Sequence, residues 1–185
     1  MHLVWPAAEY LASYVAALER GWSPDNLRAA AASEELQRIA RDADGFLATQ
    51  VDRDASAGPV TLPDGSTVPR IPGYKRWIWD GEFCAVINLR WQPGTEALPP
   101  YCLGHIGYAI VPWKRRRGYA TEALRAMLRD AAGEGLRYVD ICAEASNVAS
   151  RRVIERNGGT LIEEFVTAPS LGGRPEVRYR VSTQT

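Results

Sequence analysis

The chain has 185 residues, enough for one domain with a sizeable core, and its 22 basic and 22 acidic residues leave it without net charge. This balance excludes general binding of nucleic acid or of an anionic membrane by charge alone. The three cysteines lack metal-ligand spacing, so we expect reduced thiols, no metal site and a cytoplasmic location. We also expect no signal peptide and no membrane span, because no apolar run approaches the roughly 18 residues that a bilayer requires.

The first third of the chain is predicted to be mainly helical. After a short strand at residues 2–5, apolar residues at helical spacing predict a helix that ends at Gly21. A second helix is predicted to begin at Ser23, whose hydroxyl can cap it, with Pro24 in its first turn, and to continue to about residue 43. A strand is predicted at 46–51, and the Pro- and Gly-rich stretch that follows predicts loop to about residue 73.

The remainder of the chain alternates strands and helices. A hairpin is predicted around Asp80-Gly81, a pair suited to a tight two-residue turn. Further strands are predicted at 104–111, 138–144, 160–167 and 176–182, and further helices at 120–135 and about 147–157. This order predicts a single α/β domain over residues 1–185, with part of its sheet parallel.

Residues 111–124 read VPWKRRRGYATEAL, with four consecutive cationic side chains directly before a glycine and a helix start. The first amides of a helix have no intrahelical partners and lie at the positive end of its dipole, so they favour a phosphate group. Gly118 allows close approach of the backbone and a positive φ. The stretch therefore predicts a phosphate site. The alternatives are a solvated run of charge or a nucleic-acid patch, and the second is disfavoured by the lack of a stacking platform.

Two motifs in this half of the chain resemble those of one known family. Residues 115–120 fit R-x-x-G-x-A, which resembles the pyrophosphate-binding loop of the GNAT superfamily of N-acetyltransferases. Residues 147–159, NVASRRVIERNGG, resemble a second motif of that family, N-x-x-S/A-x-x-x-x-E-K-x-G-F, at these positions: Asn147, Ser150, Glu155, Arg156 and Gly158. The resemblance extends over residues 75–182 and is strongest to a branch of bacterial acetyltransferases whose substrates are mostly undefined.

The resemblance implies a GNAT fold: a mixed central sheet of about seven strands, flanked by about four helices, with a V-shaped splay between two central parallel strands. It also implies that acetyl-CoA binds in the splay, with backbone amides of residues 116–121 holding its pyrophosphate. The residues that the resemblance places at the cofactor are Ile110, Val111, Arg115, Arg116, Arg117, Gly118, Tyr119, Ala120, Thr121, Asn147 and Ser150. For Asn147 the alternative is simple helix capping.

Acetyl transfer to an amine needs a base for the ammonium proton and an acid for the leaving thiolate. His105 is the candidate base, because its ordinary pKa suits neutral pH and it lies on the strand before the basic cluster. The alternative is a partly buried histidine with a structural hydrogen bond. Ile154 lies where many family members carry a tyrosine acid, so the acid could be solvent, Ser150 or a tyrosine from another element.

Three polar residues are candidates for binding the acceptor. Alternation along INLRW puts Asn88 and Arg90 on one face of a strand, where Arg90 could hold a carboxylate, and Glu144 ends the strand YVDICAE. An exposed polar sheet face is the alternative for the first two, and surface solvation is the alternative for Glu144.

The resemblance implies an acetyl-CoA-dependent enzyme, monomeric or homodimeric, that acetylates a primary amine of a small molecule or protein. The competing functions are a non-catalytic CoA-binding sensor or scaffold and an acyltransferase that uses a longer acyl-CoA.

Overall fold

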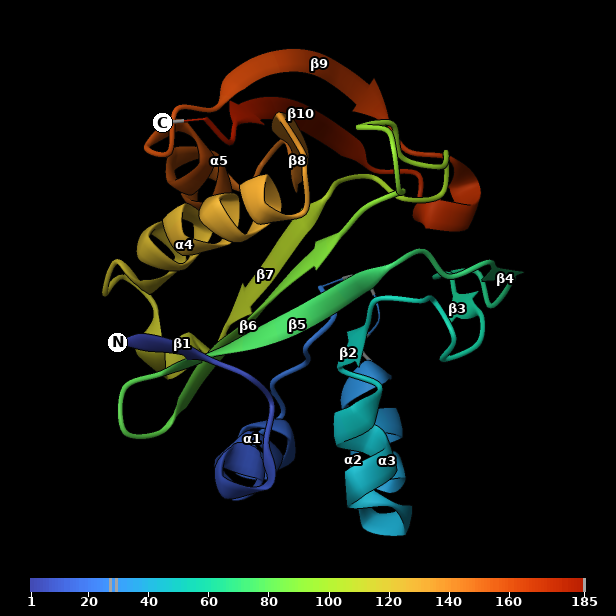
Figure 1. Cartoon of the computed structure of the whole chain (residues 1–185), viewed down its shortest axis with the longest axis vertical. Coiled ribbons are helices and arrows are strands. Elements are labelled where there is room, and N and C mark those ends of the chain that lie inside the picture. The colour runs from blue at the N-terminus through green and yellow to red at the C-terminus, as the bar shows by residue number, and fades with distance from the viewer. Residues whose placement is uncertain (27, 29, 185) are drawn as a thin grey trace.

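The computed structural model describes residues 1–184 except 27 and 29 (Figure 1). Its helices are α1 (Ala8–Glu19), α2 (Ala31–Arg41), α3 (Ala43–Ala48), α4 (Tyr119–Gly133) and α5 (Val148–Glu155), with short 3-10 turns at η1 (Pro112–Lys114) and η2 (Pro169–Leu171). Its strands are β1 (His2–Val4), β2 (Val51–Asp52), β3 (Val60–Thr61), β4 (Thr67–Val68), β5 (Gly73–Trp79), β6 (Phe83–Arg90), β7 (Ile106–Ile110), β8 (Tyr138–Glu144), β9 (Thr160–Val166) and β10 (Pro175–Ser182). The prediction of a mixed α/β fold is confirmed.

The first sheet has the strand order β1-β5-β6-β7, with β2 also paired to β5, and all of its pairings are antiparallel. The predicted hairpin is present as β5 and β6. Its loop is longer than the predicted two residues, because Trp79 pairs with Phe83 after a register shift that leaves residues 80–82 between them. Gly81 has a φ of +111°, a conformation that favours glycine.

Helices cover both faces of this sheet. In Figure 1, α1, α2 and α3 lie below it and α4 lies above it. On the lower side Tyr14 of α1 stacks on Trp77 of β5, with ring centroids 4.5 Å apart, and both side chains are fully buried. On the upper side α4 contributes Leu124 and Met127 to a core shared with Ile87 of β6. Burial of these large apolar side chains fixes the helices against the sheet.

The second sheet has the order β8-β10-β9, also antiparallel. Helix α4 connects β7 to β8, and α5 packs beside it on the same core through Ile154. Along β10, Val177, Tyr179 and Val181 face this core, so the residues between them face the other side of the sheet. The expected single sheet of about seven strands is thus divided into two sheets, flanked by five α-helices among the described residues.

The division lies between β7 and β8, where the resemblance predicted a splay. The two strands share no ladder, and one residue just before β7 joins them. The backbone N–H of His105 donates to the Asp140 carbonyl of β8 at 2.7 Å, and the Asp140 N–H donates to His105 Nδ1 at 2.9 Å. Gly104 packs directly on β8, since a Cβ there would lie 3.0 Å from the Asp140 carbonyl oxygen. The sheets therefore meet at one end and separate toward the other.

Two predictions for the N-terminal part are wrong. The second helix begins at Ala31 and not at Ser23, because the Ser23 hydroxyl bonds to the Asp25 and Arg28 carbonyls in a turn. The predicted helical positions 27 and 29 lie outside the described residues. In place of the predicted strand at 46–51, residues 46–48 end helix α3, residues 49–50 form a turn and only Val51 is in a strand. The helix forms because Asp42 caps it by accepting from the Gly45 N–H at 2.8 Å and because Phe46 is buried. In the part of the chain described, no helix is long and apolar enough to cross a membrane.

Candidate functional site

Residues 115–121, the basic loop, form the entry to α4. Gly118 has a φ of +81° and stands at the N-cap of the helix, and Arg116 also has a positive φ, of +63°. Within the described structure, the backbone N–H groups of residues 116–121 donate no hydrogen bond, whereas the Glu122 N–H donates to the Gly118 carbonyl. Arg115, Arg116 and Arg117 are exposed around these amides. Free amides at a helix N-terminus with surrounding cations suit a phosphate-bearing ligand.

The first cation of the run KRRR is not part of this loop. Lys114 is buried, and its ammonium contacts Asp80 Oδ1 at 2.9 Å and Glu82 Oε1 at 2.6 Å. Asp80 also accepts from the Tyr119 hydroxyl at 2.6 Å. Burial disfavours the charged carboxylate, but the hydrogen bonds from Tyr119 and Lys114 outweigh it and hold the pKa of Asp80 well below its usual value. The β5–β6 hairpin therefore braces the basic loop from below.

The predicted cofactor residues at the end of β7 are largely engaged within the chain. The Val111 N–H donates to the Cys84 carbonyl at 2.9 Å, and the Val111 carbonyl accepts from the Lys114 N–H at 3.0 Å. The Ile110 carbonyl accepts from Arg115 Nε at 3.3 Å. Ala120 and Thr121 lie in the first turn of α4, half-buried. A cofactor role for these residues stays a prediction.

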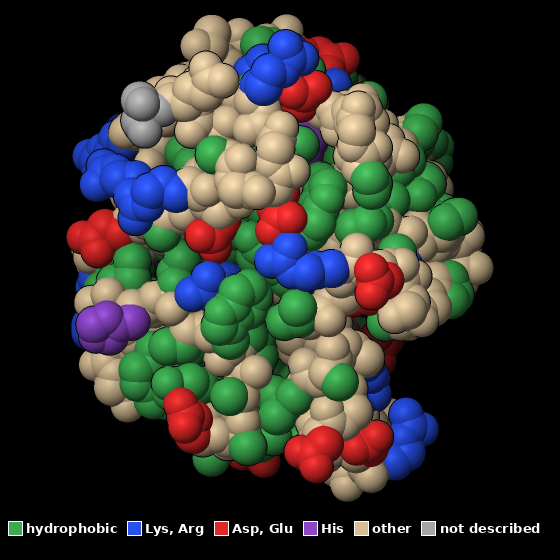
Figure 2. Space-filling model, viewed as in Figure 1, with side chains coloured by type: hydrophobic (Ala, Val, Ile, Leu, Met, Phe, Trp, Pro, Cys, Tyr) green, Lys and Arg blue, Asp and Glu red, His purple; other side chains and the backbone are tan. Residues whose placement is uncertain are grey.

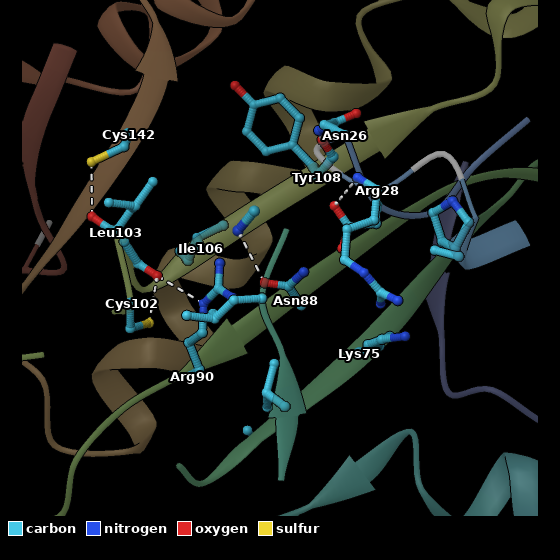
Figure 3. Close-up of a pocket in the computed structure, with 18 of the residues that line it drawn as sticks. Asn26, Arg28, Lys75, Asn88, Arg90, Cys102, Leu103, Ile106, Tyr108 and Cys142 are labelled. Carbon is cyan, nitrogen blue, oxygen red and sulfur yellow. Dashed lines mark hydrogen bonds between the residues drawn. The ribbon is translucent and has the colours of Figure 1, made fainter. Parts of the chain in front are cut away.

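A cavity of about 620 Å³ opens beside the splay, and in this article it is called the cleft (Figure 3). Five predicted site residues line it together: Asn88, Arg90, Glu144, Asn147 and Ser150. The basic loop and His105 do not line it. Side chains of both charge signs are scattered among apolar ones on the face that Figure 2 shows, so no single-sign field covers this side of the protein.

The floor of the cleft is a polar row across the first sheet. Lys75 of β5 pairs with Asn88 of β6, and Asn88 pairs with Gly107 of β7. The Gly107 N–H donates to Asn88 Oδ1 at 3.1 Å. A Cβ at Gly107 would lie 3.4 Å from both the Asn88 amide and Arg90 Nη2, so the glycine leaves these side chains room. Alternation did predict correctly that Asn88 and Arg90 share a face.

Arg90 is held at one edge of its guanidinium and free at the other. Its Nε donates to the Gly104 carbonyl at 2.8 Å, and no carboxylate of a described residue pairs with it. Figure 3 shows its side chain beside Asn88 within the cleft. A guanidinium oriented in this way presents its terminal N–H groups for a planar anion such as a carboxylate.

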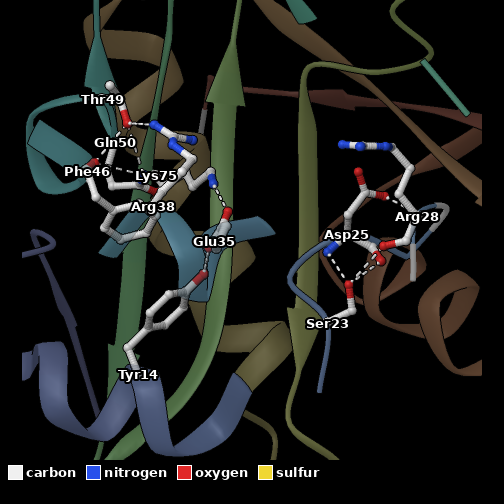
Figure 4. Close-up of polar contacts among 10 residues, drawn as sticks. All are labelled: Tyr14, Ser23, Asp25, Arg28, Glu35, Arg38, Phe46, Thr49, Gln50 and Lys75. Atoms are coloured by element: carbon white, nitrogen blue, oxygen red, sulfur yellow. Dashed lines mark hydrogen bonds and ion pairs between the residues drawn. The ribbon is translucent and has the colours of Figure 1, made fainter. Parts of the chain in front are cut away.

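The helical wall of the cleft carries a buried carboxylate, Glu35 of α2 (Figure 4). The Tyr14 hydroxyl donates to Glu35, and Lys75 Nζ lies 3.3 Å from Glu35 Oε1. Burial, and next the Glu35 charge, raises the pKa of Tyr14 well above its usual value. Glu35 therefore joins α1, α2 and β5 through its contacts with Tyr14 and Lys75.

A pair of hydroxyls lies where β7 faces α5. The Tyr108 hydroxyl is 2.8 Å from Ser150 Oγ, and both residues line the cleft. Asn147 caps α5, its Oδ1 accepting from the Ser150 N–H at 3.1 Å, as the capping alternative predicted. Burial raises the pKa of Tyr108 to about 12, so its hydroxyl stays protonated at neutral pH. Ile154 is fully buried in the core.

A pair of carboxylates lies across the ladder between β8 and β10. Glu144 and Glu176 are paired in register, and both line the cleft. Sequence analysis missed Glu176 and Tyr108. Alternation along GHIGYAIV could have placed Tyr108 on one face of its strand, but no signal in the sequence predicts which strand β10 pairs with, so Glu176 could not be placed.

His105 occupies the junction of the two sheets and not the cleft. It is fully buried, its Nδ1 accepts from the Asp140 N–H, and its Nε2 has no hydrogen-bond partner among the described residues. Burial lowers the pKa of the imidazole, and the neighbouring Asp140 opposes this only in part. This geometry is that of the structural histidine left open as the alternative, and a base role for His105 has no support from its position.

Comparison with known proteins identifies the family. A model of the GNAT acetyltransferase domain matches residues 16–160, most of the chain. The chain belongs to the GNAT acetyltransferases. The resemblance drawn from the basic loop and from residues 147–159 is thereby confirmed, and the protein is an acetyltransferase by family. No match was found among curated protein sequences.

Solved structures of acetyltransferases share the fold at low sequence identity. The microcin C7 self-immunity acetyltransferase MccE, in complex with acetyl-CoA and AMP, has a TM-score of 0.63 at 13% identity over 97% of this chain and 91% of its own. RimL, a ribosomal L7/L12 α-N-protein acetyltransferase in complex with CoA, has a TM-score of 0.62 at 16% identity over 97% and 92%. An acetyltransferase from Salmonella typhimurium that modifies the N-terminal serine of L7/L12 has a TM-score of 0.58 at 17% identity over 97% and 92%.

Proposed function

We propose that this chain, as one domain over residues 1–185, transfers an acetyl group from acetyl-CoA to a primary amine of a small molecule or protein. The observation that carries the proposal is the row of amides at the start of α4 that donate no hydrogen bond to a described residue, in a chain whose cleft is lined by paired hydroxyls and carboxylates. MccE and RimL, which share the fold, were solved with acetyl-CoA and CoA. Three free cysteines are in line with a reducing, cytoplasmic setting.

The residues of the basic loop fit the pyrophosphate of CoA. The amides of 116–121 supply oriented donors, Gly118 allows close approach, and the three exposed arginines add charge. Asn147 and Ser150 lie at the start of α5, where Ser150 contacts Tyr108 of β7. When bound, acetyl-CoA supplies the acetyl group as a thioester, which an unprotonated amine attacks to form a C–N bond with release of the thiolate.

The hydroxyl pair Tyr108 and Ser150 is the proposed proton donor to that thiolate. Its geometry supports the role, since Tyr108 is protonated at neutral pH and its hydroxyl is already hydrogen-bonded to Ser150. This assignment also accounts for Ile154 standing where many family members carry a tyrosine, because Tyr108 reaches the same helix from β7.

Asn88 and Arg90 are the proposed anchors for a carboxylate or phosphate on the acceptor, and Glu144 for its amine. Arg90 supports this role with a guanidinium edge that lacks a carboxylate partner among the described residues. The small size and mixed charge of the cleft suit a compact acceptor or the end of a peptide.

Calorimetric titration with acetyl-CoA, followed by a thiol-release assay with a panel of amines, tests the proposal. We expect micromolar binding of acetyl-CoA and weaker binding of dephospho-CoA, and release of free thiol that depends on an amine. Binding without turnover for any amine would instead indicate the non-catalytic sensor, and preference for a longer acyl-CoA would indicate a different acyl donor.

Tyr108→Phe tests the proposed acid. We expect kcat to fall by about tenfold with the Kd for acetyl-CoA unchanged, a modest loss because a thiolate is a good leaving group. Ser150→Ala removes the other hydroxyl and should lower kcat by a comparable factor. An unchanged kcat in both variants would contradict the assignment.

A further inference from the structure

Glu176 is a buried carboxylate without a bonding partner. Its exposed fraction is 7%, yet it lines the cleft, and no hydrogen bond or ion pair joins its carboxylate to a described residue. A buried charge is usually paired, because removing it from water is costly. An unpaired one on a cavity wall is therefore available to a ligand of opposite charge.

The charged groups around Glu176 come from three segments. Glu144 lies directly opposite it on β8, and Arg174, in the loop before β10, lies 4.0 Å from Glu144. Cys142 is on the same face of β8, where its thiol donates to the Leu103 carbonyl at 2.8 Å. Arg178, the next residue of β10 on that face, is paired with Glu163 of β9 at 2.5 Å. Among the described residues, Arg174 is thus the cation that faces the two carboxylates, and its side chain is nearly half exposed.

A short turn of the chain connects the carboxylate pair, Glu144 and Glu176, to the hydroxyl pair, Tyr108 and Ser150. The Asn147 N–H donates to the Glu144 carbonyl at 2.8 Å, which turns the chain from β8 into the start of α5, where Ser150 meets Tyr108. The Ala145 N–H donates to the Pro175 carbonyl at 3.0 Å, which ties this turn to the residue before Glu176. The carboxylate pair and the hydroxyl pair are therefore connected through the hydrogen-bonded turn between β8 and α5, and both line the cleft.

We propose that Glu176, facing Glu144, binds the ammonium group of the acceptor and takes its proton. The inference rests on the proposed function. One proton passes from the ammonium nitrogen to Glu176, which leaves a lone pair to attack the thioester carbonyl. The C–N bond forms as the C–S bond breaks, and the Tyr108–Ser150 hydroxyl pair donates a proton to the leaving thiolate. The nitrogen loses a second proton, which restores the hydroxyl pair, and Glu176 returns its own proton to solvent.

The environment of Glu176 suits this role. Burial, and next the charge of Glu144, raises its pKa above the usual value, while Arg174 opposes the rise. A carboxylate with a raised pKa is a stronger base than a solvated one. Two carboxylates facing one site also select a cationic acceptor, so we expect alkyl ammonium groups and α-amino groups to be acetylated in preference to anilines.

Glu176→Gln tests the inference, with Glu144→Gln as the matched variant on the facing strand. We expect Glu176→Gln to lower kcat at least about 100-fold for the best amine of a panel of amino acids, amino-acid amides and short peptides. The Kd for acetyl-CoA should be unchanged. In the parent protein kcat/KM should fall as pH drops through the raised pKa of Glu176. This acid-side decrease in the pH profile should be absent in Glu176→Gln. Glu144→Gln should mainly raise KM and lower that pKa.

A second readout does not depend on turnover. Carbon-13 NMR titration of the glutamate carboxyl groups should show one resonance that titrates above the ordinary range and disappears in Glu176→Gln. Turnover in Glu176→Gln equal to that of the parent, or a carboxyl that titrates at an ordinary pKa, would overturn the inference. Failure of the parent protein to bind acetyl-CoA would instead contradict the proposed function itself. Unaltered melting temperature separates the chemical effect from loss of folding.

Discussion

The basic loop and the cleft, the two parts of the proposed site, offer different parts of the chain to a ligand. The loop offers backbone amides from six consecutive residues, fixed by one glycine with a positive φ. The cleft offers side chains from separate strands and helices, such as Arg90 of β6, Tyr108 of β7 and Glu176 of β10. Backbone donors survive most substitutions, whereas each side chain in the cleft can be exchanged by one mutation. On the proposed function, single substitutions should therefore alter phosphate binding less readily than they alter the choice of acceptor.

The substitution expected to have the largest effect is Gly118→Val, which tests whether the backbone amides of the loop bind the phosphate. A branched residue is strained at a φ of +81°, so the amides of the loop should lose their common orientation. We expect the Kd for acetyl-CoA to rise by at least about 30-fold, measured by calorimetry. Gly133→Ala is the control, because it lies at the far end of α4 with an ordinary φ and open space around its Cβ. Equal Kd values for the two variants would mean that side chains and not amides hold the phosphate.

Asp80→Asn should weaken the contacts between the β5–β6 hairpin and the basic loop, and so lower the stability of the fold. The pKa of Asp80 is lower in the folded chain than in the unfolded chain, so its stabilising effect is fully present above about pH 4 and is lost as pH falls further. We expect the variant to lose about 2 kcal/mol of unfolding free energy at pH 7, from broken charged hydrogen bonds to Lys114 and Tyr119. Urea unfolding at pH 7 and pH 3 checks this. The difference from the parent should shrink at pH 3, and exposed Asp54→Asn should show no difference.

Arg90→Ala should alter the acceptor end alone. We expect KM to rise about tenfold for acceptors that carry a carboxylate or phosphate and to change little for simple alkyl amines. Arg90→Lys keeps the charge without the planar fork and should recover only part of the affinity. Steady-state kinetics on both acceptor classes check this. An equal loss for both classes would show that Arg90 acts through its bond to the Gly104 carbonyl.

The smallest effect should come from Arg116→Ala. Arg116 is exposed, so its contribution to phosphate binding is screened by water and salt. We expect the Kd for acetyl-CoA to rise about threefold in low salt and less in high salt, measured by calorimetry. Arg125→Ala, exposed further along α4, serves as the control. A loss as large as that of Gly118→Val would contradict the view that the amides dominate.

What could be predicted from the sequence follows the same division. The loop was found because Arg115, Gly118 and the helix start are neighbours in the chain, and local geometry follows from local residues. The β5–β6 hairpin and the facing of Asn88 and Arg90 were predicted by alternation, which is also local. Glu176 could not be placed, because its pairing with Glu144 depends on the order of strands in the second sheet.

One error shows where a local signal misleads. Ser23 and Pro24 have the residue types of a helix start, but Ser23 satisfies carbonyls of a turn instead, and the helix begins later. For His105 the residue type indicates the chemistry of a base but not its surroundings. The junction buries the imidazole and engages Nδ1 with the Asp140 amide, and its role as a base stays a prediction.

The junction between the two sheets has a consequence for the proposed acceptor site. Asn88 and Arg90 belong to the first sheet and Glu144 and Glu176 to the second, and all four line the cleft. His105 and Gly104 contact β8 just before β7 begins, so the angle at which the sheets meet there sets the distance between the proposed anion anchor and the carboxylates. On the proposed function, packing at the buried histidine therefore helps to set the length of acceptor that can reach both groups.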